Sequence, residues 1–246
     1  MPGAERGAGF ASVVFDCDST LVAVEGIDEL AGPHAAEVRA LTEAAMAGVV
    51  PLEEVYGRRL ELIRPTRRAV AAVGRAYVAA LVEDARETAA ALRWLGREVR
   101  IVSGGLAPAV QAVAQVLGLS PEAVAAVSVE FDAAGRYAGF DAASPLARAG
   151  GKAELLAGWR LPRPALLVGD GATDLEARPA VDAFAAYMGV VFRPAVAAGA
   201  DYVLRSPSLA PVLALAADPA GRRRLRGSPW AALLHKGEAL LASART

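Results

Sequence analysis

Short apolar segments, rich in β-branched and aromatic residues, recur along the chain and alternate with segments of helical periodicity. Clear strand candidates are residues 10–15, 98–102 and 164–168, with weaker ones at residues 183–187 and 201–204. Helical patterns lie between them at residues 86–95, 108–117 and 152–159. Buried parallel strands have near-continuous apolar sequences, and strands that alternate with helices are typical of a parallel sheet. The pattern therefore predicts an α/β fold.

The interval between the first two strands breaks this alternation. Residues 22–83 contain no good strand, and helical patterns cover residues 27–46, 52–63 and 66–82. Pro51 and Pro65 stand where helices would begin, a position that proline favours. We therefore expect residues 22–83 to form an all-helical insertion in a core made of residues 1–21 and 84–206.

Two later segments also depart from the strand–helix alternation. Residues 127–140 have the pattern of a β-hairpin, with a glycine-containing turn at residues 132–135. Residues 207–246 are expected to form a helical C-terminal extension. It carries a basic cluster, Arg222, Arg223, Arg224 and Arg226. A solvated helix face is the favoured interpretation of this cluster over a binding patch.

The composition excludes several classes of protein. Of the 246 residues, 54% are hydrophobic and 22% are charged, which indicates a folded chain rather than a disordered one. The 26 basic and 27 acidic residues argue against a nucleic-acid partner bound through bulk charge. Every long apolar stretch contains a breaker, so we expect no membrane partner. The single cysteine, Cys17, excludes an internal disulfide and a cysteine-built zinc site. The first residues lack the pattern of a secretory signal, so we expect a cytoplasmic protein.

Polar side chains follow each of the three clear strands. Loops at the carboxyl ends of neighbouring parallel strands meet in one crevice. We therefore expect several carboxylates and hydroxyls to lie together there. The residues concerned are Asp16, Asp18 and Thr20 after the first strand, Ser103 and Gly104 after the second, and Asp170 and Asp174 after the third.

This set of side chains suits phosphoryl transfer. Crowded carboxylates repel one another unless a proton or a cation intervenes, and Mg²⁺ suits a site of two carboxylates and a substrate phosphate. Lys152, one of two lysines in the chain, precedes the third strand and supplies a compact charge for a phosphate oxygen. The Ser103 hydroxyl and nearby backbone N–H groups can hold an anion. Phosphoryl transfer needs this combination of positioning and charge neutralisation.

The order of these motifs carries a family resemblance. Residues 16–20 (DCDST), Ser103, Lys152 and residues 169–174 (GDGATD) resemble the haloacid dehalogenase superfamily of phosphotransferases. Four further segments resemble the phosphoserine phosphatase family within it: residues 25–31, 46–51, 59–63 and 137–141. The resemblance covers roughly residues 10–205. It implies a Rossmann-like parallel sheet flanked by helices, with residues 22–83 as a small helical cap.

The resemblance also implies roles in catalysis. Asp16 would be the nucleophile that forms an aspartyl-phosphate. Asp18 would be the general acid that protonates the leaving oxygen and then the base that activates water. Mg²⁺ would be held by Asp16, by Asp170 and by the backbone carbonyl of Asp18.

Substrate recognition is implied in the same way. The substrate would be a small phosphomonoester, O-phospho-L-serine, and the protein a monomer or homodimer. Its ammonium would pair with Glu25 and its carboxylate with Arg59, and Asp174 would orient Lys152 or the waters of the metal. The phosphate ligands would be Thr20, Ser103, Gly104 and Lys152, and the other substrate contacts Met46 and Thr173.

Three alternatives remain open on the sequence alone. The same core could pass its phosphoryl group to an acceptor alcohol such as homoserine. It could hydrolyse another small phosphomonoester such as phosphocholine, a possibility raised by Ala47 and Leu52, where relatives often have Gly and Phe. A non-catalytic phosphate-sensing module would not need an acid at Asp18, so that residue favours an enzyme.

Overall fold

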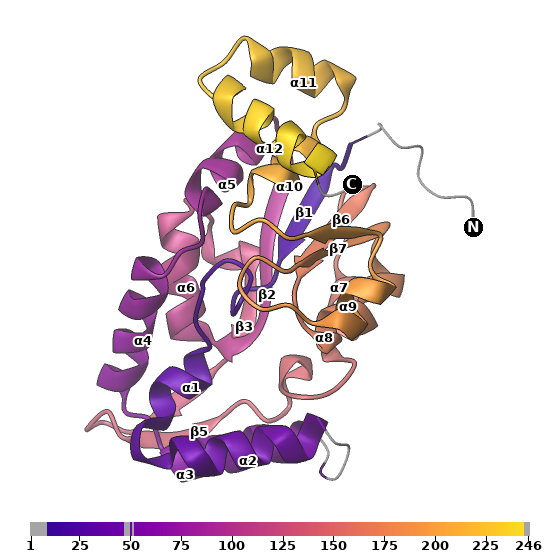
Figure 1. Ribbon diagram of the computed structural model, residues 1–246. Helices are drawn as coiled ribbons and strands as arrows, with labels where there is room; N and C mark the ends of the chain where they lie inside the picture. Colours follow the sequence, from indigo (N-terminus) through magenta and orange to yellow (C-terminus); the bar gives the residue numbers. More distant parts are fainter. Residues whose placement is uncertain (1–8, 47–49, 51, 244–246) are drawn as a thin grey trace.

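The computed structural model describes residues 9–46, 50 and 52–243 (Figure 1). Its centre is a six-stranded sheet in the order β3-β2-β1-β6-β7-β8, in which every neighbouring pair is parallel. The strands are β1 (Ser12–Phe15), β2 (Glu98–Leu106), β3 (Val124–Val127), β6 (Ala165–Gly169), β7 (Ala183–Tyr187) and β8 (Tyr202–Leu204). The prediction of an α/β fold with a parallel sheet is confirmed.

Helices cover both faces of this sheet, which explains why the central strands are apolar along their whole length. Every residue of β1, β6 and β7 is buried. Figure 1 shows α5 and α6 on one side of the sheet and α7, α8 and α9 on the other. The bounds of these helices are α5 (Ala85–Trp94), α6 (Ala107–Val116), α7 (Gly151–Gly158), α8 (Ala172–Glu176) and α9 (Pro194–Gly199).

Four of the described helices lie in residues 22–83, the segment predicted as an insertion. They are α1 (Gly26–Ala31), α2 (Ala35–Met46), α3 (Leu52–Ile63) and α4 (Arg67–Ala79). The expectation of one continuous helix over residues 27–46 is wrong. Gly32, with φ of 48°, ends α1, and a 3₁₀ turn at Gly32–His34 with Pro33 near its start separates α1 from α2. The α4 helix begins as predicted, with the Thr66 hydroxyl accepting a hydrogen bond from the Ala69 N–H at 3.1 Å.

The second strand and the hairpin also differ from the prediction in detail. β2 continues to Leu106, and its register with β3 shifts between Val102 and Leu106, so Ser103 lies in an irregular strand end rather than in a loop. The short edge strand β3 was not predicted. The hairpin forms as expected: β4 (Val129–Phe131) and β5 (Tyr137–Phe140) make a separate two-stranded antiparallel sheet.

The C-terminal segment packs against the core as helices α10 (Ala210–Ala216), α11 (Pro219–Arg226) and α12 (Ala231–Ser243). The basic cluster is not a plain solvated face. Arg222 lies 2.9 Å from Glu238 on α12, and Arg226 lies 3.5 Å from the same carboxylate. Arg224 stacks over the Trp94 ring of α5 at 4.9 Å. These side chains tie the C-terminal helices to one another and to the core. None of the described helices is long and apolar enough to cross a membrane.

We expect Leu213→Ala to destabilise the whole protein although it lies in the C-terminal segment. Leu213 on α10 is 0% exposed, and truncating a buried leucine costs about 2–5 kcal/mol. The measurement is the free energy of unfolding from urea denaturation. Leu62→Ala, on α3 and partly exposed, is the matched control and should cost far less. If Leu213→Ala lowers the free energy of unfolding as little as Leu62→Ala does, α10 is not part of the cooperative core.

Candidate active site

A cavity of about 330 Å³ lies at the carboxyl ends of the central strands, between the core and the helices that follow β1. Eight of the residues predicted for the site line it. They are Asp16, Asp18, Glu25, Arg59, Ser103, Gly104, Lys152 and Thr173. The convergence expected from the sequence is therefore present in the fold.

Lys152 is the buried cation at the base of this cavity. Its Nζ lies 2.8 Å from Oδ2 of Asp16 and 2.7 Å from Oδ1 of Asp174. Burial would lower the pKa of Lys152, but the two carboxylates outweigh it and raise that pKa overall. Lys152 therefore remains an ammonium, placed beside Asp16 where it can attract a phosphate oxygen.

Asp174 is completely buried and both of its oxygens have donors. Oδ1 accepts from Lys152, and Oδ2 accepts from the Gly171 N–H at 3.0 Å. A Cβ on Gly169, the last residue of β6, would collide with this carboxylate, so the glycine is required for Asp174 to lie there. These contacts suit a residue that orients Lys152.

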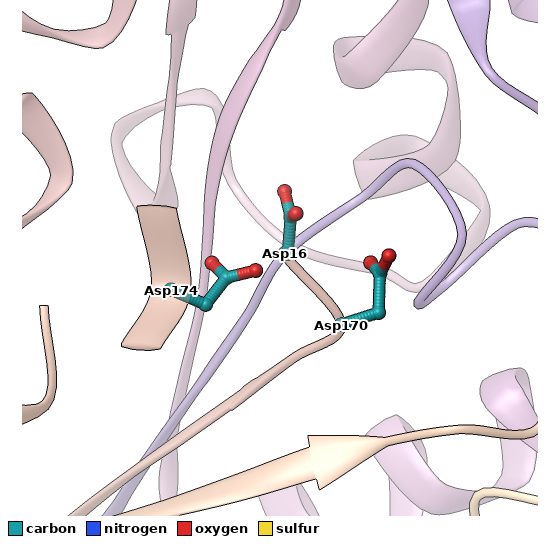
Figure 2. Close-up of side chains that lie close together, drawn as sticks. All are labelled: Asp16, Asp170 and Asp174. Atoms are coloured by element: carbon teal, nitrogen blue, oxygen red, sulfur yellow. The ribbon is translucent and has the colours of Figure 1, made fainter. Parts of the chain in front are cut away.

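Asp16, Asp170 and Asp174 form a buried carboxylate cluster (Figure 2). One oxygen from each lies within 4.8 Å of the others. Burial raises the pKa of Asp16 and of Asp170, and the charge of Asp174 raises both further. The negative charges of these carboxylates are not fully balanced by nearby cations. A hard divalent cation binds well to such closely spaced oxygen ligands. The cluster can therefore hold such a cation, with Asp16 and Asp170 as the better ligands because Asp174 alone of the three is completely buried.

Asp18 stands apart from this cluster, on the side of the cavity nearer to α1 and α4. Its Oδ1 accepts a hydrogen bond from the Tyr77 hydroxyl, and its Oδ2 accepts a long one, 3.4 Å, from the Gly26 N–H. Burial raises the pKa of Asp18 to about 6, against the opposing effect of these two donors. A carboxyl group with this pKa can both give and take a proton near neutral pH, as an acid–base catalyst must.

The predicted phosphate ligands are only partly brought together. Ser103 and Gly104 line the cavity, and the Ser103 hydroxyl accepts from the Gly105 N–H at 2.9 Å. Thr20 does not line it. Its hydroxyl is fully buried and donates to Oδ1 of Asp170 at 2.9 Å. The structure therefore gives Thr20 a role in holding Asp170, because the tight turn after Cys17 points its side chain toward β6.

Glu25 and Arg59 also line the cavity, and both belong to the segment between β1 and α5. The Glu25 carboxylate accepts from the Ser19 hydroxyl at 2.6 Å, and burial and the nearby Asp18 raise its pKa. Arg59 donates to the Thr42 hydroxyl at 3.4 Å, while its buried Nε has no hydrogen-bond partner among the described residues. An unpaired buried N–H is costly, so this guanidinium suits an incoming anion.

Two of the predicted substrate contacts are less informative. Thr173 lines the cavity at the start of α8. Met46 ends α2, but its side chain, like residue Ala47, lies outside the described part of the chain.

Arg193 belongs to the site and was missed by the sequence analysis. It follows β7, lines the cavity and donates through Nε to Oδ2 of Asp170 at 3.1 Å. Its Nη2 also lies 3.8 Å from the Glu25 carboxylate. The signal was available, because the loop after β7 leaves the same edge of the sheet as the loops after β1 and β6.

The cation-free protein should lose stability as pH rises from about 4 to about 7, because burial raises the pKa of Asp18 to about 6 and that of Glu25 to about 7. The folded protein keeps the Asp18 proton up to pH about 6, above the ordinary value of 3.8. The contribution of Asp18 to the free energy of unfolding is therefore complete below pH about 4 and is lost as pH rises through about 6. The raised pKa values of Asp16 and Asp170 act in the same direction. The measurement is the melting temperature in a chelator across this range.

A divalent cation should reverse this loss, because it competes with protons for the same carboxylates. The rise in melting temperature on adding Mg²⁺ is expected to be larger at pH 8 than at pH 5. An equal rise at both values would contradict the assignment of the carboxylate cluster as the cation site.

Comparison with known proteins agrees with this geometry. The model of the haloacid dehalogenase-like hydrolase family matches residues 10–182. The chain is 38% identical over 203 residues to the chloroplastic phosphoserine phosphatase of Arabidopsis thaliana, covering 78% of this chain and 68% of that protein. It is 36% identical over 198 residues to the phosphoserine phosphatase of Homo sapiens, covering 78% of this chain and 88% of that one.

Solved structures give the same result. A substrate-bound phosphoserine phosphatase complex superposes with a TM-score of 0.69 and 25% identity, covering 85% of this chain and 98% of the other. A phospho-aspartyl intermediate analogue of phosphoserine phosphatase gives 0.67 and 25%, with 84% and 98% covered. From these matches and from the site itself, the chain belongs to the haloacid dehalogenase-like hydrolases and, among them, to the phosphoserine phosphatase family.

Proposed function

We propose that this protein hydrolyses O-phospho-L-serine to L-serine and phosphate through an aspartyl-phosphate on Asp16, with Mg²⁺ as its cofactor. The observation that carries the proposal is the pairing of two sets of groups in one cavity. Asp16 and Lys152 lie at its base, and Glu25 and Arg59 lie on its wall. The first pair suits a phosphoryl group, and the second suits the ammonium and carboxylate of an amino acid.

The reaction proceeds in two displacements. A carboxylate oxygen of Asp16 attacks phosphorus as the bond to the serine oxygen breaks, and Asp18 donates its proton to that oxygen. Asp18, now ionised, takes a proton from a water molecule that attacks phosphorus, which releases phosphate and restores Asp16. Two easier displacements thus replace one difficult one.

The remaining residues hold the reactants in place. Lys152 and the Ser103–Gly104 strand end bind the phosphoryl oxygens, and Asp174 holds Lys152 in position. Asp16, Asp170 and the backbone carbonyl of Asp18 would bind Mg²⁺, which when present neutralises negative charge on the phosphoryl group. Helices α1–α4 would act as the cap, since Glu25 and Arg59 belong to that segment.

The direct test is phosphate release from O-phospho-L-serine with Mg²⁺ and in its absence. Strong, cation-dependent release is expected, and Asp16→Asn should reduce it to less than about one thousandth because the nucleophile is lost. Phosphocholine serves as a second substrate, and added homoserine as an acceptor. Preferred cleavage of phosphocholine would refute the amino-acid specificity, and a phosphorylated acceptor as main product would show a transferase.

Arg59→Gln tests the carboxylate contact. A hydrogen bond to a charged group is worth about 1.5–3 kcal/mol, so KM for O-phospho-L-serine should rise about 10–100-fold. Cleavage of phosphoethanolamine, which has the ammonium but no carboxylate, should be unchanged. Arg58→Gln is the matched control, because this neighbouring side chain is 54% exposed and pairs with Glu54. A similar loss for both substrates would contradict the role given to Arg59.

The cytoplasmic location and the monomeric or homodimeric state stay predictions from the sequence. The domain limits at residues 22–83 and 207–246 are also predictions, and the helices α1–α4 and α10–α12 support them.

A further inference from the structure

Tyr77 is a buried residue of α4 that does not line the cavity, but its hydroxyl contacts a residue that does. It is 0% exposed and donates to Oδ1 of Asp18, which lies 59 positions earlier in the chain. Nothing in the sequence pattern singled it out, since it follows the apolar periodicity of the helix. Its contact with the acid–base residue is nevertheless one of the few that link the helices after β1 to the chemistry.

The backbone fixes the distance between Tyr77 and Asp18. The two connections between the core and the inserted helices run side by side, one just after Asp18 and one just after α4. The Ala23 N–H donates to the Ala80 carbonyl at 2.8 Å, and the Val82 N–H donates to the Leu21 carbonyl at 3.0 Å. Tyr77 is only three residues from this pairing. Its ring is therefore anchored to the same backbone that presents Asp18.

Glycines leave the space that the hydroxyl occupies. A Cβ on Gly26, the first residue of α1, would collide with the Tyr77 hydroxyl. A Cβ on Gly105 would lie 3.5 Å from it. The ring itself packs among apolar side chains, including Val73 and Leu106. Asp18 is the only hydrogen-bond partner of this hydroxyl that the structure shows among the described residues.

We propose that Tyr77 is a positioning residue that holds the Asp18 carboxyl group in one orientation for proton transfer. The inference rests on the function proposed above. Since Oδ1 accepts the O–H of Tyr77, the proton that Asp18 gives up is carried on Oδ2. It passes from Oδ2 to the serine oxygen as the phosphorus–oxygen bond breaks, and Oδ2 then receives a proton from the attacking water. Tyr77 itself exchanges no proton in either step.

This role predicts a loss that depends on the leaving group. In Tyr77→Phe the ring still fills its slot, but Asp18 can rotate, and misplacing a catalytic group costs about 10–100-fold. We expect kcat for O-phospho-L-serine to fall by about that factor, with KM changed by less than about twofold. A p-nitrophenolate leaving group departs without a proton. With p-nitrophenyl phosphate, the burst that reports phosphoenzyme formation should therefore keep its rate, while the later turnover slows.

Tyr187→Phe is the matched control. Tyr187 on β7 is also 0% exposed, and its hydroxyl donates to the Pro207 carbonyl at 2.6 Å, away from the cavity. It should lower the melting temperature by a similar amount without changing either kinetic constant. A second variant, Gly26→Ala, should reproduce the kinetic defect of Tyr77→Phe, because its methyl group displaces the hydroxyl while the tyrosine remains.

A double-mutant cycle with Asp18→Asn completes the test. If Tyr77 acts through Asp18, Tyr77→Phe should change the residual rate of Asp18→Asn by less than about twofold. Multiplicative losses, an equal slowing of phosphoenzyme formation from both substrates, or wild-type kcat in Tyr77→Phe would each overturn the inference. A wild-type enzyme inactive on O-phospho-L-serine would instead refute the proposed function. The same comparison would then be made with the alkyl phosphate that the enzyme does cleave.

Discussion

The ammonium of Lys152, enclosed between Asp16 and Asp174, is the interaction on which the site depends. A buried charge is tolerated only when its partners compensate for the water it has lost, and here the N–O distances are 2.8 and 2.7 Å. Satisfying this ammonium requires β1, α7 and α8 to meet at one point. The parallel sheet makes that possible, because β1 and β6 are neighbours and deliver Asp16 and the Asp170 loop to the same edge.

Carboxylates outnumber cations around this ammonium, and the imbalance gives the site its chemistry. Burial and mutual repulsion raise the pKa of Asp16 and Asp170, so the cluster favours binding of a divalent cation. Asp18 is kept out of the cluster by its hydrogen bonds to Tyr77 and Gly26. The same loop thus supplies Asp16, the proposed nucleophile, which is paired with a lysine, and Asp18, the proposed acid–base residue, whose pKa burial raises to about 6. Differences of environment, rather than of residue type, separate the two roles.

Local sequence patterns were sufficient for most of the fold and for the centre of the site. Apolar runs identified β1, β2 and β6, and the polar residues after them were correctly expected to converge. The errors occurred where a local pattern was ambiguous. Helical periodicity ran through Gly32 and Pro33, although the φ of 48° at Gly32 ends α1 there. The strand β3 was missed because it has only four residues, two of which are alanines that carry little strand signal.

The sequence by itself therefore determined the order of strands and helices and the chemical groups at the carboxyl edge of the sheet, because both follow from short-range periodicity and from the geometry of parallel strands. Only the tertiary structure decided which partner each group has. Thr20 donates a hydrogen bond to Asp170, which is 150 positions away in the sequence, and Tyr77 donates one to Asp18, which is 59 positions away. Arg193 lies 3.8 Å from the Glu25 carboxylate. Such pairings depend on how whole elements pack, and no pattern within a short stretch of sequence specifies them.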